Sequence, residues 1–386
     1  MSSDSRPPDE NDNGEKMKKL FPVMLLCLIP FLACHDKALP ESNQILYVGS
    51  YTSKGSEGIS VFELDQQTGA LTLLQTARAE NPSFLAIQPN DYLYAVSEVA
   101  NYLGERSGAL LSFKINPKTW ELTFINAQPS AGEHPCHVTA TQDGRVFVAN
   151  YSSGNIAMCV AQEGVLSAAV TAQHAGSGPN ADRQRGPHAH SVNLSPDERF
   201  LYAVDLGIDK IMIYDLAQET FTPAEQPFVR TAPGAGPRHF VFHPQGQFAY
   251  VINELNSTIT AYSFDAADGS LAELATVPTT PPDYHGDNSG ADIHITPDGR
   301  FLYGSNRGHD SLVIYRIDAQ TGGLALVGHQ STLGKTPRNF AIDPSGTFLL
   351  AANQNSDNIV VFRIHPATGE LRETGHQAKM SKPVCI

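Results

Sequence analysis

Short runs of alternating hydrophobic and polar residues recur along most of this chain. Typical runs are TITAYSFD from Thr258, IMIYDL from Ile211 and LVIYRID from Leu312. They alternate with a period of two and are rich in β-branched and aromatic residues, both of which are features of β-strands. The pattern therefore predicts a chain built almost entirely of short strands.

An internal repeat organises these strands. The phrase Pro-(Asp/Ser)-Gly-x-Phe-Leu-Tyr and its variants begin at Gln88, Thr141, Ser195, His243, Thr296 and Asp343, at intervals of 47 to 54 residues. Around each copy the pattern predicts one strand before the phrase, one within it, an alternating strand after a polar loop, and a weaker outer strand. Four strands at this period are typical of a propeller blade. We interpret the recurring Pro-Asp-Gly and Thr-Gly sequences as turn chemistry only.

The two ends of the repeat region complete a seventh copy. Residues 45–65 supply the second and third strands of a blade that lacks its first strand, and residues 382–386 resemble a first strand without a blade. Joining them closes the ring and removes its exposed sheet edges. The predicted fold is all-β: a seven-bladed β-propeller with four-stranded blades over residues 44–386, closed by the C-terminal strand in the N-terminal blade.

The residues before this region have a different composition. Residues 1–16 are polar and acidic, and we interpret them as a disordered extension or as the product of a mis-assigned start. Residues 17–34 begin with Met-Lys-Lys and continue with an apolar run too short to span a membrane, which predicts a signal peptide followed by a linker over 35–43. Ala33 before Cys34 suggests lipidation at Cys34, although Phe31 departs from the usual Leu. We expect an exported protein, either periplasmic or membrane-anchored; the alternative is a cytoplasmic one.

Charge and cysteine content narrow the class of partner. The formal net charge of -14 disfavours nucleic acid, because phosphate backbones are bound by basic surfaces. An anionic small molecule would need a local basic site. Cys136, Cys159 and Cys385 are an odd number at irregular spacing, which indicates neither a disulfide framework nor a CxxC metal site.

Equivalent positions in the seven repeats should form rings around the central axis. The start of each first strand gives one ring: Ser83, Cys136, His190, Arg238, Ala291, Arg338 and Val384. The loop after each second strand gives another: Tyr51, Glu98, Tyr151, Leu206, Glu254, Arg307 and Gln354. Residues that differ from blade to blade indicate function, whereas the recurring asparagines before the second ring favour a structural role.

A long insertion precedes the third repeat. Residues 174–190 read HAGSGPNADRQRGPHAH, and Gly/Pro-rich insertions on rigid scaffolds often bind ligands. Arg183 and Arg185 would attract a phosphate or carboxylate, but a solvated loop explains them equally well. His188 and His190 could suggest a metal, yet no third ligand stands at a recognisable spacing, so we expect neither metal nor cofactor.

Four motifs carry a family resemblance: GPHAH, GPRH, INE and SNR. With the repeats, they resemble the seven-bladed propeller lactonases, a family that includes bacterial 6-phosphogluconolactonases and fungal 3-carboxymuconate lactonizing enzymes. The resemblance implies a catalytic set of His190, Arg238, Glu254 and Arg307. We expect Arg183, Arg185, His188 and His239 to bind substrate.

Opening a lactone needs a base that activates water and donors that hold the developing oxyanion. Either Glu254 or His190 could be the base, and Arg238 and Arg307 could hold the oxyanion or an acid group of the substrate. The favoured function is hydrolysis of a sugar lactone, as in 6-phosphogluconolactonases. The alternatives are a muconate-type lactonizing cyclase and a non-catalytic propeller that binds a surface partner. An exported protein would not be expected to meet a phosphosugar.

Overall fold

The computed structural model describes residues 43–386 except 54, 89 and 90. The predicted signal peptide, Cys34 and most of the predicted linker lie outside the described residues. The described residues form one compact unit, and among them no helix is long and apolar enough to cross a membrane.

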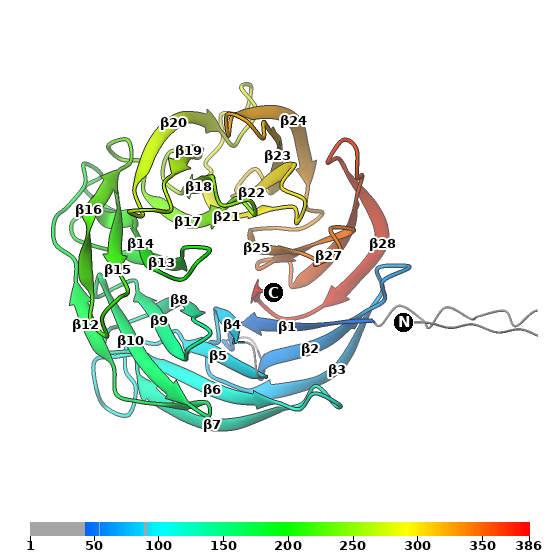
Figure 1. Ribbon diagram of the computed structural model, residues 1–386. Helices are drawn as coiled ribbons and strands as arrows, with labels where there is room; N and C mark the ends of the chain where they lie inside the picture. The colour runs from blue at the N-terminus through cyan, green and yellow to red at the C-terminus, as the bar shows by residue number, and fades with distance from the viewer. Residues whose placement is uncertain (1–42, 54, 89–90) are drawn as a thin grey trace, which may run out of the picture. The chain divides into compact units, whose positions relative to one another are not determined.

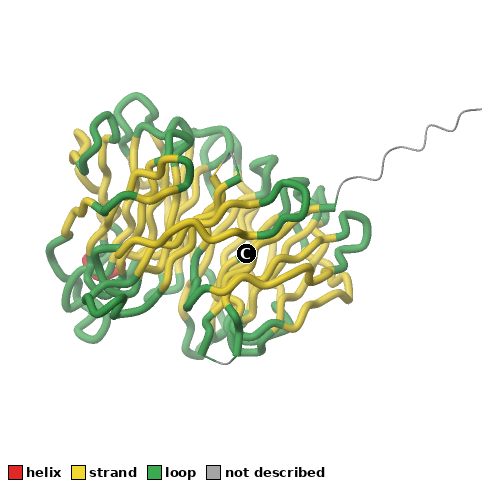
Figure 2. Tube along the Cα trace, turned by 90° about the horizontal axis from the view of Figure 1, so that it is seen from below, coloured by secondary structure: helices red, strands yellow, loops and turns green. Residues whose placement is uncertain are grey.

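Seven separate antiparallel sheets are arranged as blades around a common centre, as the repeats predict (Figure 1). The connecting loops collect on the two faces of the ring (Figure 2). In an antiparallel pair, the start of one strand and the end of the next lie together, so the two predicted rings of residues are on one face.

Blades 1 to 3 follow one another along the sequence. Blade 1 comprises β4 (Leu85–Gln88), β5 (Tyr92–Ser97), β6 (Ala109–Ile115) and β7 (Leu122–Pro129). Blade 2 comprises β8 (Pro135–Ala140), β9 (Arg145–Asn150), β10 (Asn155–Gln162), β11 (Val165–Leu166) and β12 (Val170–Gln173). Blade 3 comprises β13 (Ala189–Leu194), β14 (Phe200–Asp205), the 3₁₀ turn η1 (Leu206–Ile208), β15 (Lys210–Asp215) and β16 (Thr222–Arg230). In blade 2 the outer strand is split, because β11 and β12 both pair with β10.

Blades 4 to 6 have four strands each. Blade 4 comprises β17 (Pro237–Phe242), β18 (Phe248–Asn253), β19 (Thr258–Phe264) and β20 (Leu271–Pro278). Blade 5 comprises β21 (Ser289–Ile295), β22 (Phe301–Arg307), β23 (Ser311–Ile317) and β24 (Leu324–Ser331). Blade 6 comprises β25 (Pro337–Ile342), β26 (Phe348–Asn353), β27 (Asn358–Ile364) and β28 (Leu371–Lys379).

Blade 7 joins the two ends of the described chain. It comprises β29 (Pro383–Cys385), β1 (Gln44–Ser50), β2 (Gly58–Leu64) and β3 (Leu71–Arg78), in that order from the centre outward. Strand β29 pairs antiparallel with β1. The predicted closure of the ring by the C-terminal strand is confirmed.

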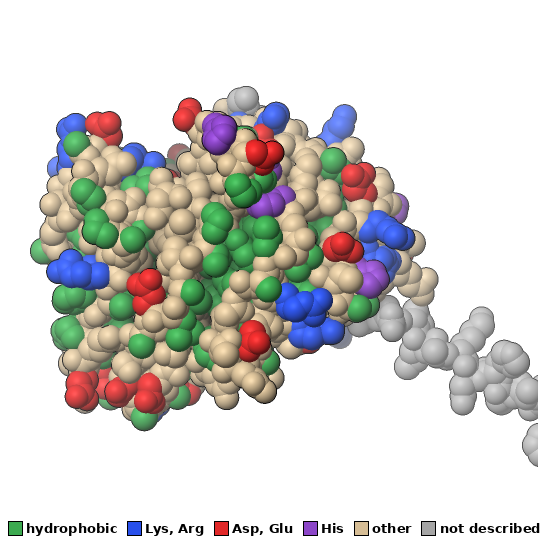
Figure 3. Space-filling model, turned by 90° about the horizontal axis from the view of Figure 1, so that it is seen from above, with side chains coloured by type: hydrophobic (Ala, Val, Ile, Leu, Met, Phe, Trp, Pro, Cys, Tyr) green, Lys and Arg blue, Asp and Glu red, His purple; other side chains and the backbone are tan. Residues whose placement is uncertain are grey.

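The core lies between blades rather than within them. Each interface between neighbouring blades has its own cluster of buried side chains; the cluster between blades 3 and 4, for example, contains Tyr202 and Val204 from β14, and Val251 and Tyr262 from β18 and β19. A further cluster seals blade 6 against blade 7 through Phe348 and other side chains. On the outer wall of the ring, hydrophobic side chains gather in the middle of one face among scattered charges (Figure 3).

Candidate active site

The side chains of the first ring lie at β-bulges. In six first strands the pairing with the second strand shifts register at this ring, between Pro135 and His137, Ala189 and Ser191, Pro237 and His239, Gly290 and Ile293, Pro337 and Asn339, and Pro383 and Cys385. In five of them the skipped residue is the ring residue itself: Cys136, His190, Arg238, Arg338 and Val384. A bulge adds an unpaired residue and re-aims its side chain, and bulges are common beside active sites.

Glu254 is the hub of the cluster that the sequence predicts. Its side chain is only 5% exposed and forms ion pairs with Arg183 (Nη2 to Oε1, 2.6 Å), Arg307 (Nη2 to Oε2, 2.8 Å) and Arg238 (Nε to Oε2, 3.1 Å). Burial alone would raise the pKa of this carboxyl, but the charges of Arg307, Arg238 and Arg183 outweigh it and lower the pKa to about 2. Glu254 is therefore ionised at neutral pH and fully engaged.

The three arginines differ in depth. The side chain of Arg238 is 2% exposed, that of Arg307 is 16% exposed and that of Arg183 is 40% exposed. Burial, together with repulsion from Arg307 and Arg338, lowers the pKa of Arg238 to about 9. Arg238 still carries its charge at neutral pH. Positive charge therefore extends from the solvent-exposed Arg183 to the buried Arg238 in the interior of the propeller.

A chain of hydrogen bonds continues inward from Arg238. Its Nη1 donates to the carbonyl of Ala291 (2.6 Å) and lies 3.1 Å from Nε2 of His239. On its other side, His239 Nδ1 lies 2.7 Å from Oδ1 of Asp292. Asp292 Oδ2 in turn lies 3.0 Å from Nε2 of His294. Burial and the charge of Arg238 lower the pKa of His239 to about 4, so its imidazole is neutral.

His190 is buried beside this network. Its ring makes edge contacts with Tyr151 and His239, with centroids 5.4 Å apart in each case, and its Nδ1 lies 3.8 Å from Sγ of Cys136. Burial, together with the charge of Arg238, holds the pKa of His190 well below its usual value. The imidazole is uncharged at neutral pH and can accept a proton.

The insertion before blade 3 is fastened to the ring by Gln184. This buried side chain donates to the carbonyl of Leu206 (2.8 Å) and to Oδ1 of Asp209 (2.7 Å). The anchor holds its neighbour Arg183 against Glu254. Arg185 turns the other way: its side chain is 80% exposed and donates to the carbonyl of Ala181, outside the cluster.

His188 lies at the edge of the cluster. Its ring stacks on Tyr151 with centroids 4.6 Å apart, and its backbone N–H donates to Asp205. Within the described part of the chain, no group of three or more His, Cys, Asp or Glu side chains is arranged to hold a metal ion.

Sequence reasoning assigned no role to Arg338 or Asp292, which belong to the same assembly. Arg338 stands in the first ring, but it lies in none of the four motifs that carry the family resemblance. Asp292 lies one position beyond that ring, and only its bond to His239 reveals its place.

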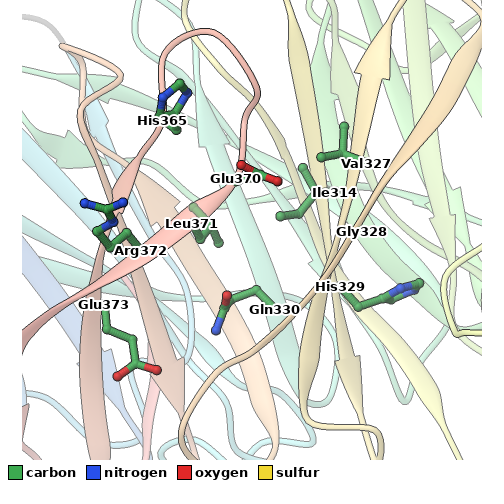
Figure 4. A pocket seen from close by; sticks show the side chains of 10 residues that line it. All are labelled: Ile314, Val327, Gly328, His329, Gln330, His365, Glu370, Leu371, Arg372 and Glu373. Carbon is green, nitrogen blue, oxygen red and sulfur yellow. The ribbon is translucent and has the colours of Figure 1, made fainter.

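A separate cleft of about 570 Å³ lies at the rim, between β23 and β24 of blade 5 and β28 of blade 6 (Figure 4). Ile314 and Leu371 contribute apolar surface to it, and Glu370 and Glu373 contribute carboxylates. It is built from outer strands and shares no residue with the central cluster.

Comparison with known proteins identifies the family of the chain. Residues 45–386 match the family model described as lactonase, 7-bladed beta-propeller. The chain belongs to this family. It is 39% identical over 302 residues to the 6-phosphogluconolactonase of Bacillus subtilis, an alignment that covers 77% of this chain and 84% of that protein.

Solved lactonase structures have the same ring. The periplasmic gluconolactonase of Pseudomonas aeruginosa superposes with a TM-score of 0.83 at 34% identity, over 88% of this chain and 97% of that one. A candidate 6-phosphogluconolactonase from Bacteroides fragilis superposes with a TM-score of 0.85 at 35% identity, over 91% of this chain and 99% of that one. The resemblance inferred from the four motifs is confirmed at the level of the family.

Proposed function

We propose that this lactonase-family protein hydrolyses a sugar 1,5-lactone, with His190 as the general base. The observation that carries the proposal is a neutral, buried imidazole whose ring contacts that of His239, which in turn lies 3.1 Å from Arg238, one of the three arginines that bind Glu254. A base must be uncharged to accept a proton, and oxyanion stabilisation needs fixed positive donors. Both conditions are met in one cluster.

The reaction follows from these roles. His190 takes a proton from water as the water oxygen attacks the lactone carbonyl carbon. Arg238 and Arg307 stabilise the negative charge that develops on the carbonyl oxygen. The ring C–O bond then breaks, and the leaving oxygen takes the proton from His190, which yields the open hydroxy acid.

Glu254 has a different role in this proposal from that of a base. Its carboxylate oxygens are occupied by three arginines, which share it as their partner, so it is not free to take a proton from water. We infer that it aligns the guanidinium groups. Sequence reasoning left Glu254 and His190 as equal candidates, and these contacts favour His190.

The test compares hydrolysis of glucono-1,5-lactone and its 6-phosphate by the full chain and by His190→Ala. After subtraction of the spontaneous rate, we expect the kcat of the variant to be about 10²- to 10⁴-fold lower than that of the native protein. This is the range typical of a lost general base. His285→Ala, an exposed histidine outside the cluster, is the matched control. Unchanged hydrolysis by His190→Ala would assign the base to another group.

We further propose that the protein acts outside the cytoplasm. The support is the apolar run after Met17-Lys18-Lys19 and the similarity to a periplasmic gluconolactonase. Cell fractionation of the protein expressed from its own promoter tests this proposal, and Cys34→Ala tests lipidation. A wholly cytoplasmic product would contradict it.

A further inference from the structure

Arg338, an arginine of the first ring, has different contacts from the three arginines that bind Glu254. It lies in β25 at the bulge of blade 6, with its guanidinium carbon 5.7 Å from the centre of the Tyr51 ring. Among the described residues it has no hydrogen-bond or ion-pair partner, whereas Arg183, Arg238 and Arg307 all bind Glu254. Its side chain is partly exposed.

The contact with Tyr51 does not account for a charge in this position. A cation–π contact contributes about 0.5–2 kcal/mol. Complete removal of an ion from water costs several kcal/mol even after relaxation, and the half-buried side chain of Arg338 bears part of that cost. An arginine near the centre of the ring with only an aromatic partner is therefore a group poised to bind an anion.

The charge balance around Arg338 points the same way. A carboxylate within its electrostatic reach is that of Glu98, which accepts a hydrogen bond from the hydroxyl of Tyr51 (2.9 Å). Four arginines (Arg183, Arg238, Arg307 and Arg338) thus lie with three carboxylates (Glu98, Glu254 and Asp292), an excess of positive charge in a protein whose net charge is -14. The positive charge of Arg338 also lowers the pKa values of Arg238, Arg307 and His190, which places it within electrostatic reach of the proposed reaction centre.

We propose that Arg338 is a specificity-determining residue that binds an anionic substituent of the lactone, a phosphate ester or a carboxylate, while Arg238 and Arg307 face the reacting carbonyl. This inference rests on the proposed lactonase function and names its substrate class. The planar guanidinium fork binds either group in a bidentate manner. The protein then distinguishes anionic from neutral lactones.

The kinetic test uses three substrates with the full chain: glucono-1,5-lactone, its 6-phosphate, and glucaro-1,4-lactone, which carries a carboxylate. We expect Arg338→Met to lower kcat/KM about 10- to 100-fold for one anionic lactone and less than about 3-fold for the neutral one, the loss that one charged hydrogen-bonding partner supports. The anionic substrate that shows the loss identifies the group as phosphate or carboxylate. Arg372→Met, an exposed arginine of the same blade, is the matched control.

A binding measurement separates this inference from the proposed function. Titration calorimetry with 6-phosphogluconate, glucarate and gluconate measures anion recognition without turnover. Tighter binding of an anion-bearing ligand by the native protein, lost in Arg338→Met and partly kept in Arg338→Lys, supports the inference even if no lactone is hydrolysed. The inference is overturned if Arg338→Met lowers kcat/KM equally for all three lactones. It is also overturned if the native protein and the variant bind all three acids equally well.

Discussion

Asp292 determines which ring nitrogen of His239 carries the proton, although Asp292 itself makes no hydrogen bond to Arg238. Arg238 can only donate, so Nε2 of His239 must be unprotonated where the two meet at 3.1 Å. The remaining proton is then on Nδ1, which donates to Asp292. Asp292 thereby fixes the tautomer of His239 and, through it, the orientation of Arg238, as carboxylates do behind many functional histidines.

Asp292→Asn should expose this positioning role. An amide can present its N–H to Nδ1, which favours the opposite tautomer and sets an N–H against Arg238. We expect kcat to fall about 10- to 100-fold, the range for a supporting partner, with little change in KM and a shifted pH profile. Asp283→Asn, an exposed aspartate outside the network, is the control. A lower melting temperature with an unaltered pH profile would indicate a purely structural residue.

Glu254 should make stability depend on acid pH. Its pKa falls from an ordinary 4.5 to about 2 on folding. A carboxyl with a lowered pKa adds stability that is complete above about 4.5 and is lost as the pH falls towards 2. Denaturant unfolding between pH 5 and pH 2.5 should therefore show a flatter pH dependence for Glu254→Gln than for the native chain. Parallel curves would contradict the three-arginine arrangement.

Part of the site could be predicted from sequence, and the rest depends on side-chain direction. The ring alignment placed His190, Arg238, Glu254 and Arg307 at one end of the blades, since equivalent positions in a repeat share one depth, and the family resemblance singled them out. It could not tell that Arg185 faces solvent, because its neighbour Gln184 decides which way the insertion turns. Nor could it tell that Glu254 already binds three arginines.

At the scale of elements, the turns that end in Thr-Gly, or in Asp-Gly at Asp268-Gly269, dock onto the Phe-Leu-Tyr strands of the preceding blade. The hydroxyl of Tyr202 donates to the carbonyl of Gly269 in the next blade (2.6 Å), and those of Tyr250 and Tyr303 do the same at Gly322 and Gly369. A Cβ at Gly269 would lie 2.7 Å from the ring of Phe200. Interpreting these turns as turn chemistry only was wrong, because they also form the interface between blades.

Gly269→Ala should therefore destabilise the ring more than its backbone angle alone explains. The positive φ of 77° costs about 1–2 kcal/mol for a residue with a side chain, and overpacking adds about 1–3 kcal/mol. Gly375→Ala is the matched control, since Gly375 has a φ of 80° but a Cβ added there would meet no atom within 4 Å. Urea unfolding should show the larger loss at Gly269; equal losses would contradict docking.

At the scale of the whole molecule, the number of blades and the closure of the ring could be predicted because each blade repeats the same buried strands. The split of the outer strand in blade 2 could not, because outer strands face solvent and their sequences are weakly constrained. Strand β12, for example, has the exposed Val170 and no buried residue. Periodicity is informative only where a side chain is buried.

The pairing of β29 with β1 also sets an order of assembly during synthesis. Blades 1 to 6 are contiguous in sequence, so each can pack on the one before it as the ribosome delivers it. Strand β1 is made before all of them, yet its inner neighbour β29 is made after every other described strand. Until then the nascent chain carries an unpaired strand edge of the kind that recruits other chains, and its protection from aggregation depends on the late arrival of residues Pro383–Cys385.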